Sequence, residues 1–115
     1  MCLICDRENL LGKKSLTIQI CPKVKAIPYI EGLQRLDIIQ CKNISKIAPI
    51  KSLIVLIIIG CPNITSLPNL PLLKGLKLQC KGLKQIPQYE NLERLELHNE
   101  SVVDIPEYSK LQYLY

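Results

Sequence analysis

The sequence contains no phenylalanine and no tryptophan, and tyrosine is its only aromatic residue. A core organised around a few large rings is therefore excluded. Hydrophobic residues still make up 48% of the 115 residues, mostly as leucine and isoleucine, and 22% are charged. These proportions are typical of one folded domain and argue against disorder of the whole chain. Many aliphatic side chains of similar size must fill the core, which suits a regular lattice.

No segment is apolar for long enough to cross a membrane. The longest apolar run is Leu53 to Ile59, whereas a membrane-spanning helix needs about 20 such residues. The segment from Met1 to Leu11 also lacks the continuous apolar run of an export signal, because Asp6 and Glu8 interrupt it. We therefore expect no membrane span and no export signal.

Arginine is scarce, and the net charge of +5 comes from lysines scattered along the chain. A nucleic-acid site usually has its basic residues clustered on one face, often with aromatic residues between them. The sequence shows neither feature, so we expect a solvated basic surface and no nucleic-acid partner. The alternative is a surface that binds an acidic partner or nucleic acid. The scattered lysines include Lys23, Lys25, Lys42, Lys46, Lys81 and Lys84.

A repeat of about 20 residues organises the chain. The copies follow the pattern L-x-x-L-x-L-x-x-C/N-x-x-L-x-x-L/I, and most continue with proline. One residue is lost before Cys80, and the last copy has the same shorter spacing before Asn99. The matched sets are Leu33, Leu36, Ile38, Cys41, Ile44, Ile47; Leu53, Leu56, Ile58, Cys61, Ile64, Leu67; Leu73, Leu76, Leu78, Cys80, Leu83, Ile86; and Leu92, Leu95, Leu97, Asn99, Val102, Ile105.

This pattern resembles the leucine-rich repeat family. The segments GCPNITSLPNLPLLKGLKL and IPQYENLERLEL are similar to the short repeats of plant intracellular immune receptors, bacterial LPX-type effectors and leucine-rich proteins of large DNA viruses. The resemblance implies an α/β-type leucine-rich-repeat solenoid with a parallel β-sheet on its concave face, little or no α-helix, and a protein-binding role. We expect residues 1–12 to form an N-terminal cap or arm, and residues 13–115 to form about five repeats and a final strand.

Each repeat should contain one strand followed by an extended return segment. In the L-x-L part, alternation places Leu36 and Ile38 on the buried side of a strand and Asp37 on the other side. The proline that follows lacks the N–H that a strand ladder or a helix interior needs. We expect the return segment to be extended or polyproline-like, with at most a short 3₁₀ turn, and the strands to pair in parallel.

Four of the six cysteines, Cys21, Cys41, Cys61 and Cys80, occupy equivalent positions of the repeat. This spacing favours a buried ladder of reduced thiols over a disulfide scaffold, because cysteine also behaves as a small hydrophobic residue. Reduced thiols in turn indicate a reducing compartment, the cytoplasm or the nucleus. We predict a cytoplasmic protein, located in the host cytoplasm if it is viral or a bacterial effector.

Cys2 and Cys5 form a C-x-x-C, which is half of a zinc knuckle, and the segment CLIC looks like the opening of a RING-type finger. The other ligands are missing, since no second C-x-x-C follows and His98 is the only histidine. We therefore expect no metal and no cofactor, and a place for both cysteines in the N-terminal cap. Zinc bound by Cys2 and Cys5 within one chain, or shared by two chains, is the alternative, and it would suggest an adaptor in ubiquitin transfer.

Catalysis is not expected. A thiol nucleophile needs a general base nearby, but His98 should lie on the concave face while the ladder cysteines point inward. Glu93 and Glu96 lie beside Arg94 on an open strand that implies no enclosed pocket. No phosphate-binding glycine motif and no H-E-x-x-H motif occurs.

The residues between the strand leucines should form a partner-binding surface. The third repeat places only aliphatic residues there, and such an exposed patch predicts a protein interface with a charged rim. One alternative is that an insertion, a terminal arm or a second copy covers this row. Another is a self-assembling unit, a homodimer through this row or through the open edge of the last strand. The candidate partner-binding residues are Arg35, Asp37, Ile39, Ile54, Val55, Ile57, Ile59, Lys74, Lys77, Glu96 and His98.

Overall fold

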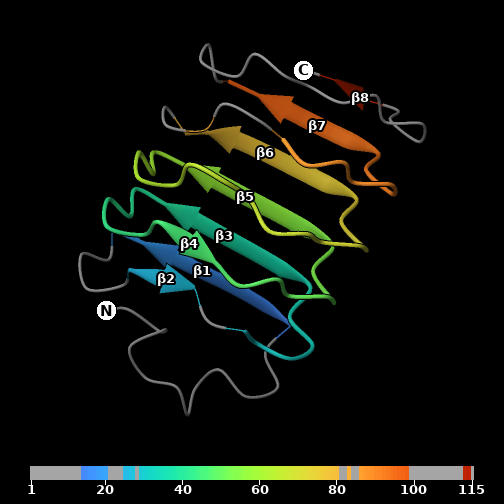
Figure 1. The fold of residues 1–115 in the computed structure, drawn as a ribbon, viewed down its shortest axis with the longest axis horizontal. Helices are drawn as coiled ribbons and strands as arrows, with labels where there is room; N and C mark the ends of the chain where they lie inside the picture. Colours follow the sequence, from blue (N-terminus) through green and yellow to red (C-terminus); the bar gives the residue numbers. More distant parts are fainter. Residues whose placement is uncertain are drawn as a thin grey trace.

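The computed structural model describes residues 14–20, 25–27, 29–80, 83 and 86–98 and the strand Tyr113–Leu114. Over these residues the chain winds into a solenoid in which each turn adds one strand to a parallel sheet (Figure 1). The described part contains no helix, and so none that is long and apolar enough to cross a membrane. The predicted parallel-sheet solenoid with little or no helix is confirmed. The proposed N-terminal cap lies outside the described residues.

The main sheet has six strands in the order β1-β3-β5-β6-β7-β8. The repeat fixes the register, because residues at equivalent positions pair across every strand boundary. Leu36, for example, pairs with Leu16 on one side and with Leu56 on the other. The strands are β1 Ser15–Gln19, β3 Arg35–Ile39, β5 Val55–Ile59, β6 Gly75–Gln79, β7 Arg94–Leu97 and β8 Tyr113–Leu114.

Inward-facing side chains stack in columns, one residue per turn, and together they form a continuous aliphatic core. Leu36 and Ile38 are fully buried while Asp37 between them is half-exposed, as the alternation predicts. None of the described polar or charged residues is buried. Removal of this apolar surface from water, at about 25 cal/mol per Å², is therefore the main favourable contribution to folding.

One column of inward-facing residues was not part of the predicted repeat pattern. Its members precede each strand, and each accepts a backbone hydrogen bond from the residue three positions later, as Ile50 does from Leu53 over 3.1 Å. This turn brings the chain back toward the next strand of the main sheet. The buried members of the column are Ile30, Ile50, Leu70 and Tyr89.

On the return side of the solenoid, β2 (Ala26–Ile27) and β4 (Lys46–Ile47) form a short parallel sheet of their own. The N–H of Ala48 donates to the carbonyl of Ile27 over 2.9 Å. Pro68 stands at the equivalent position of the next turn and has no N–H, so the pairing ends at β4. The extended return segments match the prediction, but the small sheet was not predicted, and the described residues contain no 3₁₀ turn.

A left-handed residue ends each of the first three long strands. The backbone φ is 51° at Ile20, 53° at Gln40 and 68° at Gly60. In the next turn Cys80 follows Gln79 directly. The residue lost in the shorter repeat is therefore the left-handed one.

Candidate functional site

The side of the main sheet that points away from the core, here called the open face, consists of columns of paired residues. Alternation along each strand brings every second side chain to this face. The strand residues predicted to bind a partner all lie on it, which confirms their expected orientation. Its three columns are Ser15, Arg35, Val55, Gly75 and Arg94; Thr17, Asp37, Ile57, Lys77 and Glu96; and Gln19, Ile39, Ile59 and Gln79.

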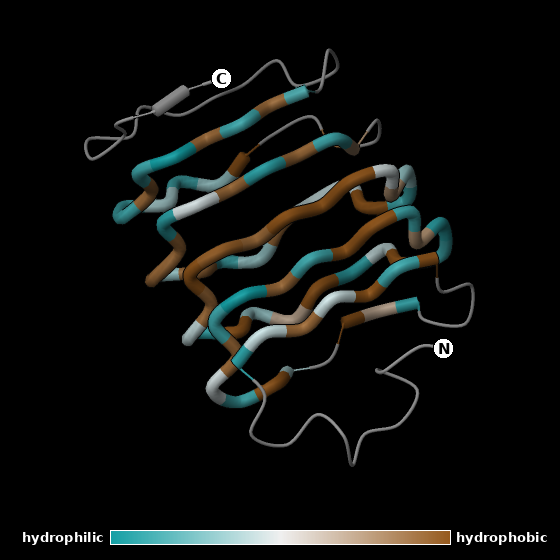
Figure 2. The backbone as a smooth tube through the Cα atoms, turned by 180° about the vertical axis from the view of Figure 1, so that it is seen from behind, coloured by the Kyte–Doolittle hydropathy of each residue, from teal (hydrophilic) through white to brown (hydrophobic). Residues whose placement is uncertain are grey.

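An aliphatic patch, defined as Ile39, Val55, Ile57 and Ile59, occupies the centre of the open face. Figure 2 shows β5 as a continuously hydrophobic strand between neighbours that alternate in hydropathy. The patch residues and Ile54 were expected to be exposed, but all are half-buried. The reason is that β-branched side chains in register cover one another, as Ile39 and Ile59 do across β3 and β5.

A charge pair borders the patch on the β3 side. The guanidinium of Arg35 contacts both carboxylate oxygens of Asp37, with Nε 3.2 Å from Oδ1 and an NH group 3.3 Å from Oδ2. Thr17 on β1 donates a third hydrogen bond to Oδ2 of Asp37 over 3.5 Å. The Asp37 carboxylate is thus held in place, while the Arg35 side chain is 53% exposed and accessible to a partner.

A second charged group borders the patch on the β6 and β7 side. Glu96 lies between two basic side chains, 3.2 Å from Nζ of Lys77 and 3.6 Å from Nε2 of His98. The hydrogen bond from Lys77 lowers the pKa of the Glu96 carboxyl. Lys74, in the turn before β6, is also exposed. The predicted rim residues therefore flank the patch on both sides.

The ladder cysteines lie on the other side of the main sheet, inside the core. Cys41, Cys61 and Cys80 are free thiols with at most 1% of their surface exposed. Each sulfur is 3.7 to 3.9 Å from a carbonyl oxygen of the preceding turn, at Ile18, Ile38 or Ile58. The predicted reduced ladder is confirmed for these three cysteines. Cys2, Cys5, Cys21 and Asn99 lie outside the described residues.

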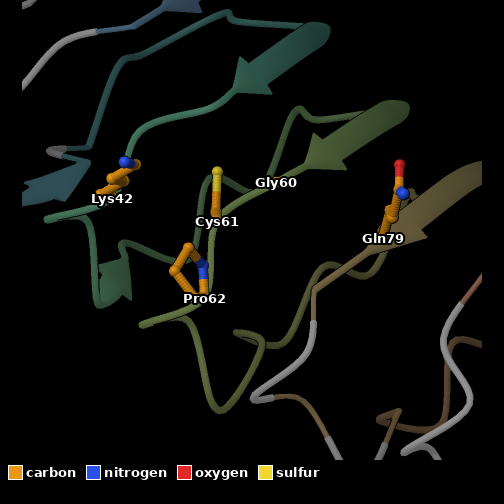
Figure 3. Close-up of a pocket in the computed structure, with 5 residues that line it drawn as sticks. All are labelled: Lys42, Gly60, Cys61, Pro62 and Gln79. Atoms are coloured by element: carbon orange, nitrogen blue, oxygen red, sulfur yellow. The ribbon is translucent and has the colours of Figure 1, made fainter.

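A hollow of about 250 Å³ lies at the ends of the strands, between Lys42, Gly60, Cys61, Pro62 and Gln79 (Figure 3). It forms where Gly60 has no side chain and the following repeat is one residue shorter. Burial raises the pKa of the Cys61 thiol, and a protonated thiol is a poor nucleophile. Among the described residues, no three metal-ligating side chains lie together. This hollow therefore offers neither a reactive thiol nor a metal site.

No protein-family profile, no curated protein and no solved structure matches this chain. Function is therefore inferred from the open face itself. The open face has an aliphatic centre and two charged borders. Within the described part of the chain, this face has no enclosed group of catalytic side chains.

Proposed function

We propose that the chain is a binding module of the leucine-rich-repeat type, without enzymatic activity, that binds a protein partner through its open face. The observation that carries this proposal is the aliphatic patch on β3 and β5 between two charged borders. Protein interfaces commonly have an apolar centre and a polar rim, and contiguous apolar patches on a protein surface mark interaction sites.

The patch and its borders have different roles in this proposal. Burial of Val55, Ile57 and Ile59 against a partner supplies affinity, at about 25 cal/mol per Å² of apolar surface removed from water. Arg35 and Lys77 are exposed enough to meet charges on the partner, which favours fast and selective association more than tight binding.

The proposed partner is a protein of a reducing compartment. Three buried thiols support this location, because proteins exposed to oxidising conditions usually carry disulfides. We propose the cytoplasm, or the host cytoplasm if the chain is a viral or bacterial host-interaction protein.

Self-assembly is the second candidate, because β5 is an uncharged β-branched strand of the kind that associates with copies of itself. Light scattering of the purified, reduced protein over a range of concentrations separates the two functions. A dimer that Ile57→Lys and Ile59→Lys dissociate supports self-assembly through the patch. A monomer of 13.1 kDa leaves the patch open for another protein.

The proposal is tested by a photo-reactive amino acid placed at Ile57 on the open face or at Lys46 on the return side. Lys46 is an exposed residue of β4 and serves as the matched control. We expect a discrete crosslinked protein from position 57 and none from position 46. Equal crosslinking from both positions would show that the open face has no special role.

A further inference from the structure

The positive charge of the chain is concentrated in four consecutive return segments of the repeat, residues 21–30, 41–50, 61–70 and 80–89. Together these segments contain six lysines and no aspartate or glutamate. The six lysines leave nine of the fifteen basic residues for the rest of the chain, against ten acidic residues. The return segment that follows, residues 99–108, is acidic. The net positive charge therefore comes from these four segments.

Three of the six lysines lie within the described residues, and the fold brings them onto two neighbouring turns. The carbonyl of Lys25 accepts a hydrogen bond of 2.9 Å from the N–H of Ser45. Lys46 pairs with Ala26 across β2 and β4, so Lys25 and Lys46 are diagonal neighbours on strands about 4.8 Å apart. Lys42 precedes Lys46 in the same turn. All three lysines are exposed, and no ion pair between described residues involves them.

The residues around these lysines are small and polar. Ser45 lies next to Lys46, and Thr65 and Ser66 stand at the equivalent positions of the next turn, all of them exposed. Protein interfaces have an apolar centre and are depleted in lysine and serine. Lysine and hydroxyl side chains are, in contrast, common partners of the phosphate oxygens of nucleic acids. The return side therefore matches a phosphate backbone better than it matches another protein.

The same composition favours a duplex over the other large sources of phosphate. Single strands are bound largely by stacking of their bases on aromatic side chains, and stable membrane binding takes the insertion of apolar groups. Among the described large hydrophobic residues that are exposed, only Tyr29 belongs to a return segment. A duplex keeps its bases stacked and presents its backbone, which cations and hydroxyl groups can bind without such residues.

We propose that the return side binds the phosphate backbone of a double-stranded nucleic acid, independently of base sequence, through Lys25, Lys42 and Lys46. The sequence alone predicted no nucleic-acid partner, because these lysines are far apart along the chain. The solenoid brings them together and so removes that argument. The inference does not rest on the proposed function, since the open face lies on the opposite side of the core.

Binding of labelled RNA and DNA duplexes of unrelated sequence to the whole protein tests this inference, in a buffer of about 50 mM salt. We expect all the duplexes to bind with similar affinity. The double variant Lys42→Gln, Lys46→Gln should bind about tenfold more weakly, because it loses two phosphate contacts. The slope of log affinity against log salt concentration should become shallower by about two.

The matched control is the double variant Lys14→Gln, Lys51→Gln. These lysines are exposed as well, and they stand before β1 and in the turn before β5. The control removes the same net charge and should change the affinity much less, because salt screens charges that do not contact the duplex. All four lysines are exposed, so both variants should keep the melting temperature of the wild type.

Three results would overturn the inference. Equal losses of affinity in the two variants would show that only net charge matters, and no duplex binding at about 50 mM salt would show that the lysines are merely solvated. Tighter binding of a single strand of the same length, or of vesicles that contain anionic lipid, would show that a duplex is not the occupant of this surface.

Discussion

The phenol group of Tyr89 donates a hydrogen bond of 2.9 Å to the carbonyl oxygen of Pro68 on the preceding turn. Tyr89 occupies a core column that is otherwise aliphatic and is only 1% exposed. Pro68 marks the place where backbone pairing on the return side ends, because proline has no N–H. The tyrosine side chain therefore joins two turns that the return strands do not join.

Tyr89→Phe should lower the free energy of unfolding by about 1 kcal/mol, because it removes this hydrogen bond and keeps the ring in the core. Urea denaturation of the purified protein measures the change. Tyr29→Phe is the matched control, since Tyr29 is 53% exposed and should show little change. Equal stabilities of the Tyr89 variant and the wild type would contradict the role assigned to the hydroxyl group.

Ile20 should be a site of backbone strain, because a β-branched residue rarely adopts a positive φ. Its φ is 51° and its side chain is 63% exposed, so little packing would be lost with it. Ile20→Gly should raise the free energy of unfolding by about 1 kcal/mol.

Gly60 stands at the position equivalent to Ile20 in a later repeat, and it allows the opposite substitution to be tested. Its φ is 68°, and an added Cβ would lie 3.3 Å from Cγ of Gln40. Gly60→Ala should therefore destabilise the protein by about 1 kcal/mol. Chemical denaturation of Ile20→Gly and Gly60→Ala measures the two changes in the free energy of unfolding. Changes of the same sign would contradict backbone strain at this left-handed position of the repeat.

Cys80 should make stability depend on pH in the alkaline range. Burial, with a smaller effect of Cys61, raises the pKa of the Cys80 thiol from 9.0 to about 12. The folded state thus binds this proton more tightly than the unfolded state. The stabilisation is fully present below about pH 9 and is lost as the pH rises toward about 12.

The free energy of unfolding should therefore fall more steeply above pH 9 in the wild type than in Cys80→Ala. Denaturation series at several alkaline pH values give the two slopes. All other titratable groups are common to both proteins, so their effect cancels in the difference. Parallel slopes would mean that the Cys80 thiol titrates alike in the folded and unfolded states.

Gly75→Ala should stabilise the isolated protein by about 0.4–1 kcal/mol, because the backbone conformation suits alanine and the unfolded chain loses freedom. The added methyl group would meet Val55 only at an ordinary contact distance of 3.7 Å. Thermal unfolding measures the effect. A lower melting temperature would show that glycine is needed for the fold.

Much of the fold could be predicted from the sequence because the repeat is regular. The spacing of Leu36, Ile38 and Cys41 in successive copies gave the strand positions, the parallel register and the buried side of the sheet. The column containing Tyr89 was missed, since it lies between the proline and the next leucine, outside the repeat pattern that was used for the prediction. The members of this column recur along the sequence at the same interval as those of the other columns, and this periodicity could have revealed it.

The sequence was less informative about the return side and the open face. The small return sheet is extended by a hydrogen bond from the N–H of Ala48, in a column where most repeats have proline. The ion pair of Lys77 with Glu96 depends on side-chain conformations that no repeat pattern specifies. Half-burial of the aliphatic patch likewise follows from how neighbouring side chains pack, and the gathering of lysines on the return side was not predicted.

The most direct test of binding through the open face is competition for the protein that crosslinks to position 57. Unlabelled wild-type protein and the Lys46→Glu variant should suppress this crosslink at similar concentrations. Ile57→Lys places a charge at the centre of the aliphatic patch, and at least about ten times more of it should be needed. If all three proteins compete equally well, the partner does not bind the aliphatic patch, and the central proposal is wrong.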